Sequence, residues 1–137
     1  MNQMLANNPY SQYQQTQVET ASPERLLLML YDGAIRFANV AMKALEDKDF
    51  STSNTNCLKV QNILNELMVT LDMKVGGELA KNLFDLYDFM TRETVEANIS
   101  KNARRLEGVI EIFKELREAW MQAAKNVGAL KTSQAIA

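Results

Sequence analysis

The residues able to do chemistry are few in this sequence of 137 residues, and their spacing suits no catalytic site. There is no histidine, the usual general base near neutral pH and the commonest metal ligand, which excludes Ser-His-Asp and Cys-His sites and His-ligated zinc. The single cysteine, Cys57, can form neither an intramolecular disulfide nor a cysteine-rich metal site. The sequence therefore predicts no enzyme, no metal site and no cofactor.

Two local clusters also favour ordinary turns over chemistry. Asp47 and Asp49 lack the glutamate that completes an EF-hand loop, so we expect a solvated turn there. The pair Gly76-Gly77 has no strand before it and no phosphate-binding spacing around it, which again predicts a turn.

Charge and hydropathy narrow the class of partner. The chain carries 15 Lys and Arg against 17 Asp and Glu, with the basic residues scattered, so nucleic acid is not an expected partner. No run approaches the roughly 20 apolar residues of a membrane span, and the N-terminus lacks a secretory signal pattern. With its lone cysteine, the chain is expected to be a cytoplasmic protein without direct membrane insertion.

The apolar residues repeat with helical spacing in four segments. Residues 1–21 are rich in Asn and Gln and predict a mobile N-terminal arm. Ser22-Pro23-Glu24 then marks a helix start. We expect a first helix over 22–46 and a second over 50–71. A third helix is expected between the turn at 72–77 and the break at 100–102, and a fourth from that break to Gly128. The short connections predict an all-α fold, an antiparallel up-down four-helix bundle over 22–128, with a disordered tail over 129–137.

Several apolar residues fall outside the stripe that one bundle core requires. On the first expected helix, the surplus apolar residues widen the apolar arc. On the second helix, two surplus apolar residues share a face with two asparagines. Further surplus apolar residues occur on the third and fourth helices. Two interpretations remain open: a wide stripe packs against two neighbouring helices, or the surplus forms a groove for amphipathic partner helices. The positions are Leu28, Tyr31, Ile35 and Met42; Leu58 and Val69 with Asn62 and Asn65; Phe84 and Phe89; and Ile112.

An ordered set of short strings carries a family resemblance over about residues 8–124. Together these strings closely resemble the FliS family of flagellar export chaperones. They are Asn8-Pro9-Tyr10-Ser11-Gln12-Tyr13-Gln14-Gln15, Val18-Glu19-Thr20-Ala21-Ser22-Pro23, Met29-Leu30-Tyr31-Asp32-Gly33-Ala34, Gln61-Asn62-Ile63, Gly76-Gly77-Glu78-Leu79-Ala80, Leu86-Tyr87-Asp88-Phe89-Met90, Ala97-Asn98 and Ala119-Trp120.

The resemblance implies a cytoplasmic, non-enzymatic chaperone that binds the disordered C-terminal segment of flagellin and prevents its premature polymerisation. It further implies delivery to the export-gate membrane protein of the flagellar secretion system, and other flagellar assembly or regulatory proteins are further candidate partners. The tyrosine-containing arm is expected to cover part of the binding surface when flagellin is absent. The expected partner-binding residues are Tyr10, Tyr13, Gln14, Leu28, Tyr31, Ile35, Met42, Leu58, Asn62, Asn65, Val69, Phe84 and Tyr87.

A second class of protein uses the same exposed stripes differently. A self-associating structural helical bundle would pair them with its own copy. A size measurement at low concentration distinguishes the two, because we expect the chaperone to be largely monomeric.

Overall fold

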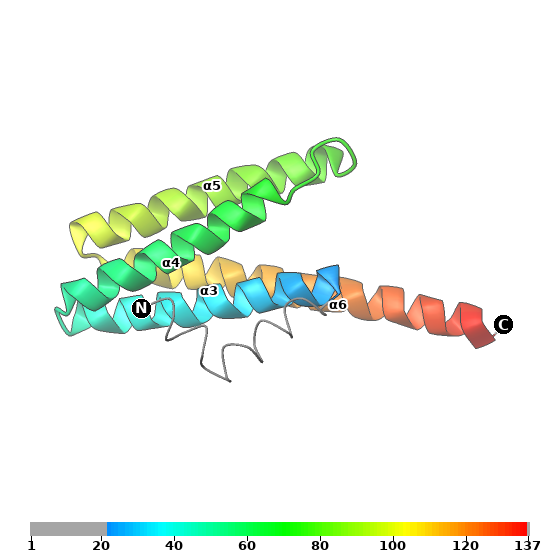
Figure 1. Cartoon of the computed structure of the whole chain (residues 1–137), viewed down its shortest axis with the longest axis horizontal. Helices are drawn as coiled ribbons and strands as arrows, with labels where there is room; N and C mark the ends of the chain where they lie inside the picture. The colour runs from blue at the N-terminus through cyan, green and yellow to red at the C-terminus, as the bar shows by residue number, and fades with distance from the viewer. Residues whose placement is uncertain (1–21, 137) are drawn as a thin grey trace, which may run out of the picture.

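Four long helices make up the part of the chain that the computed structural model describes, residues 22–136, with side chains up to Asn126. They are α3 (Pro23–Glu46), α4 (Phe50–Val69), α5 (Gly77–Ser100) and α6 (Ala103–Ile136) (Figure 1). Each packs against the next along the chain, and α6 closes the ring on α3. The predicted all-α, four-helix bundle is confirmed.

The helix starts follow the polar residues seen in the sequence. The backbone N–H of Arg25 donates to Ser22 Oγ at 3.2 Å, with Pro23 in the first turn of α3. Asp49 caps α4 in the same way, accepting from the N–H of Thr52, and this hydrogen bonding lowers the pKa of the Asp49 carboxyl. These caps satisfy N–H groups that have no partner within a helix.

Gly76 and Gly77 make the α4–α5 turn, as predicted, and each is needed for its own reason. Gly77 has a positive φ of 52°, a conformation that costs other residues energy. A Cβ on Gly76 would lie 2.6 Å from the Cβ of Ala80 and 2.9 Å from the carbonyl oxygen of Asp72. Both glycines are therefore explained by the backbone geometry of the turn.

The C-terminal boundary of α6 differs from our expectation. The helix continues past Gly128 to Ile136, and in Figure 1 its C-terminal part projects beyond the other three helices. One glycine costs a helix about 1 kcal/mol relative to alanine, whereas the alanine, leucine, lysine and glutamine of residues 129–137 are strong helix formers. Glycine alone is therefore a weak stop signal.

The core combines small residues on α3 with large ones on its neighbours. Ala34, Ala38 and Ala41 are fully buried and allow close approach of the adjoining helices. Leu64 from α4 and Phe113 from α6 are also fully buried and belong to the same core between the helices. In the described residues no helix is long and apolar enough to cross a membrane.

Candidate protein-binding surface

The outward side of α4 carries apolar and amide side chains. Leu58 is 47% exposed and Val69 70% exposed, and Asn62 and Asn65 between them are also exposed. Their spacing, 4, 3 and 4 residues, places all four along one side of the helix. The sequence-based grouping of these four residues is thus matched by their positions.

The adjacent side of α5 extends this surface. Asn98 Nδ2 donates to Asn54 Oδ1 at 2.9 Å, which fixes the antiparallel register of α4 and α5. In that register Val69 is level with the turn of α5 that carries Phe84, which is also exposed. We call Leu58, Asn62, Asn65, Val69 and Phe84 together the outer α4–α5 face.

Three exposed apolar residues at the α4–α5 turn were missed by the sequence analysis. Val75 is 85% exposed, and Met73 and Leu79 are also exposed. Leu79 keeps the helical spacing of the α5 core residues, but it lies in the first turn of α5, where the bundle ends. The sequence did contain a signal for this exposed group, because all three apolar residues lie in or next to the predicted turn at 72–77.

Tyr31 and Tyr87 belong to the core, and their expected place on the binding surface is wrong for this conformation. Both are essentially inaccessible to solvent. Their hydroxyl oxygens lie 2.5 Å apart and share a hydrogen bond, and Trp120 Nε1 donates to the Tyr31 hydroxyl at 2.7 Å. Burial raises the pKa of both tyrosines. Trp120 itself is half-buried and packs against the core.

The other surplus residues of α3 are only partly accessible. Leu28, Ile35 and Met42 are half-buried, and the last two pack against the core. Because α3 contacts both α4 and α6, its wide apolar stripe serves two neighbours. This is the first of our two interpretations, and it leaves these residues as weaker candidates for binding.

Tyr10, Tyr13 and Gln14, the arm residues expected to bind a partner, lie outside the described residues. Their role stays a prediction.

An ion pair joins α3 and α6 beside the tyrosine cluster. Arg117 Nε donates to Asp32 Oδ1 at 2.5 Å, and this contact raises the pKa of the Arg117 guanidinium. Both side chains are partly solvated, so the pair contributes more to helix alignment than to stability. Within the described part of the chain, no group of three acidic or cysteine side chains is close enough to hold a metal ion.

Comparison with known proteins identifies the family. The family model described as "Flagellar protein FliS" matches residues 6–127. The chain belongs to the FliS family. A flagellar secretion chaperone FliS of Bacillus subtilis is 40% identical over 123 residues, covering 90% of this chain and 91% of the relative. The FliS of Salmonella typhimurium is 38% identical over 115 residues, covering 80% and 85%.

A solved structure supports the same fold for this FliS-family chain. The crystal structure of a bacterial flagellar chaperone superimposes with a TM-score of 0.72 at 18% identity, covering 86% of this chain and 99% of the other. The family is one of chaperones, so its members act by binding other proteins. The expected functional site of such a protein is therefore a surface that binds another protein.

Proposed function

We propose that this FliS-family chain is a cytoplasmic chaperone, without enzymatic activity, that binds the disordered C-terminal segment of flagellin. It would prevent premature polymerisation and help to deliver flagellin to the membrane protein of the export gate. Family membership supports the chaperone role. The observation that carries the binding proposal is the outer α4–α5 face, where Leu58, Val69 and Phe84 expose apolar surface beside two asparagines.

The chemistry of this face suits a helical client. Exposed apolar side chains at helical spacing can bury the apolar side of an amphipathic segment. Asn62 and Asn65 each offer an amide donor and acceptor, which can pair with unsatisfied backbone groups at the ends of short client helices without burying a charge. A disordered client loses several kcal/mol to ordering, so a long contact is needed and can later be released.

Calorimetric titration with the flagellin C-terminal segment from the same genome tests the proposal. We expect Leu58→Asp to weaken binding at least tenfold, because the new carboxylate would be desolvated against an apolar client helix. The melting temperature of the Leu58→Asp variant should change little, since the Leu58 side chain is already half exposed. Ile35 is unsuitable as a probe because its half-buried side chain packs against the core.

Val40→Asp is the matched control. Val40 is 42% exposed, close to Leu58, but it lies on α3 among residues of the α3–α4 connection. We expect wild-type affinity for this variant. Absence of binding by the wild-type protein, or equal affinity of Leu58→Asp and wild type, would contradict the proposal. A concentration-dependent dimer that Leu58→Asp dissociates would instead support the self-associating bundle.

A further inference from the structure

A groove of 420 Å³ lies between α3 and α4, close to the connection that joins these helices. Val40, which is 42% exposed, and Ala44 give the groove an apolar centre, and Thr52 lines its α4 side. Lys59 follows Thr52 by seven residues, so it lies on the same side of α4 and about 100° around that helix from Leu58. The groove is therefore separate from the outer α4–α5 face.

Two cations extend the groove on its side away from the α3–α4 connection. Arg36 and Lys59 are both exposed. Arg36 Cζ from α3 and Lys59 Nζ from α4 each lie 5.0 Å from the centre of the Phe37 ring. Because Arg36 precedes Val40 by four residues, it lies one helical turn from Val40 on nearly the same side of α3. The positive charges therefore border the apolar centre of the groove.

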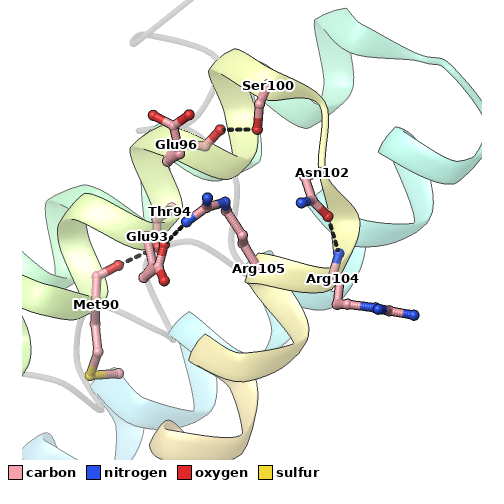
Figure 2. Close-up of polar contacts among 8 residues, drawn as sticks. All are labelled: Met90, Glu93, Thr94, Glu96, Ser100, Asn102, Arg104 and Arg105. Carbon is pink, nitrogen blue, oxygen red and sulfur yellow. Dashed lines mark hydrogen bonds and ion pairs between the residues drawn. The ribbon is translucent and has the colours of Figure 1, made fainter.

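In the described part of the chain, neither Arg36 nor Lys59 is paired with a carboxylate. Arg105 provides the contrast, because its guanidinium donates a hydrogen bond to Glu93 Oε2 (Figure 2). The Phe37 ring attracts the two cations but leaves their net charge unchanged. Both charges are thus available to the carboxylates of a partner.

The other end of the groove is acidic. Asp47 and Asp49 line it, and Asp47 pairs with Lys43 at 3.3 Å. A nucleic acid or an anionic membrane carries negative charge throughout, so either would be repelled at this end. A protein segment whose charge changes sign along its length complements both ends. Residues 1–21 contain one acidic residue, Glu19, and no Lys or Arg, so this part of the chain lacks that pattern.

We propose that the α3–α4 groove binds a segment of a second protein, other than the client, that is acidic at one end and basic at the other. Acidic residues of that segment lie beside Arg36 and Lys59. An apolar residue packs over Val40, and a basic residue lies near Asp49. This inference rests on the proposed function for its role, because a chaperone that delivers its client contacts another protein while the client is still bound.

Three labelled peptides test the charge pattern by fluorescence anisotropy at low ionic strength. The polarised peptide has a glutamate block, a central leucine and a lysine block, and the two control peptides carry glutamate or lysine in both blocks. We expect the polarised peptide to bind about fivefold more tightly than either control peptide, because only it matches both ends of the groove. Equal affinity for all three peptides would refute the proposal.

Variants on both helices test whether the peptide binds in the groove. Arg36→Glu and Lys59→Glu should each weaken binding of the polarised peptide about fivefold, and less at high ionic strength, because salt screens the lost attraction. Lys114→Glu changes an exposed residue on α6 in the same way and should bind as wild type. The double variant Arg36→Glu/Lys59→Glu should prefer the lysine peptide, a reversal that loss of folding could not produce. Equal affinity of Arg36→Glu and Lys114→Glu for the polarised peptide would place its binding elsewhere and overturn the inference.

Titration with the flagellin C-terminal segment separates this inference from the proposed function. Arg36→Glu should bind the flagellin segment as wild type, and saturation with that segment should leave the affinity for the polarised peptide unchanged. Displacement of the peptide by the flagellin segment would make the groove part of the client surface and contradict the inference. A dimer that Arg36→Glu dissociates would identify a second copy as the occupant and likewise contradict it. If the polarised peptide binds as expected but the flagellin segment does not bind, the proposed function fails while the groove stands as a binding site.

Discussion

The hydroxyl of Tyr31 is the centre of a buried hydrogen-bonded cluster, and its removal should be more costly than removal of the Tyr87 hydroxyl. The Tyr31 hydroxyl takes part in two hydrogen bonds, one with the Tyr87 hydroxyl at 2.5 Å and one from Trp120 Nε1 at 2.7 Å. It therefore connects α3 to α5 and to α6. Tyr31→Phe would remove both of these hydrogen bonds. Tyr87→Phe would remove one bond and leave Tyr31 still accepting from Trp120.

The size of each loss follows from these partners. An intramolecular hydrogen bond contributes about 1 kcal/mol net, and a buried polar group left unpaired costs about 1 to 3 kcal/mol. Trp120 is half-buried, so water can partly replace its partner. We therefore expect Tyr31→Phe to lower the free energy of unfolding by about 2 to 4 kcal/mol and Tyr87→Phe by about 1 to 2 kcal/mol.

The double variant gives the sharper test. Replacing both tyrosines removes donor and acceptor together, so the Tyr31→Phe/Tyr87→Phe loss should fall short of the sum of the single losses by about 1 kcal/mol. Urea unfolding followed by circular dichroism measures all three losses. Trp120 is the only tryptophan in the sequence, so its fluorescence should shift to the red in Tyr31→Phe but not in Tyr87→Phe.

Two results would refute this reasoning. A loss below about 0.5 kcal/mol for Tyr31→Phe would show that the cluster is not a buried network. Strictly additive losses would show that the two hydroxyls do not share a hydrogen bond.

Three further measurements test the fold and its titration. Stability should fall as the pH rises above about 9, because the raised pKa values of Cys57, Tyr31 and Tyr87 keep protons on the folded state that the unfolded state releases; a flat urea midpoint to pH 11.5 would contradict this. Phe113→Ala should cost about 3 to 5 kcal/mol because the side chain is fully buried, and a loss under about 1 kcal/mol would remove Phe113 from the core. Gly76→Ala should lower the melting temperature, whereas Gly108→Ala should raise it, because only the first added Cβ meets close neighbours; equal shifts would contradict the turn geometry.

The sequence contained enough to locate the helices and one candidate surface. Ser22 and Asp49 cap helices, as their short polar side chains allow, and the glycine pair marks the α4–α5 turn. Leu58 and Val69 lie outside the core stripe of α4, and they are exposed as that spacing predicts. Such features depend on residues within a few turns of one another, so local pattern is sufficient.

Tertiary packing decided the features that depend on how one helix meets the next. Tyr31 and Leu28 lie three residues apart on the same flank of the α3 core stripe, yet Tyr31 is buried while Leu28 is half-buried. Tyr31 meets Tyr87 of α5 and Trp120 of α6, whereas Leu28 lies about one turn nearer the start of α3. The hydrogen bond from Arg105 of α6 to Glu93 of α5 likewise depends on the register between these two helices. Helical periodicity fixes the direction of each side chain around its own axis, whereas burial is fixed by the position and angle of the neighbouring axes, which no local spacing encodes.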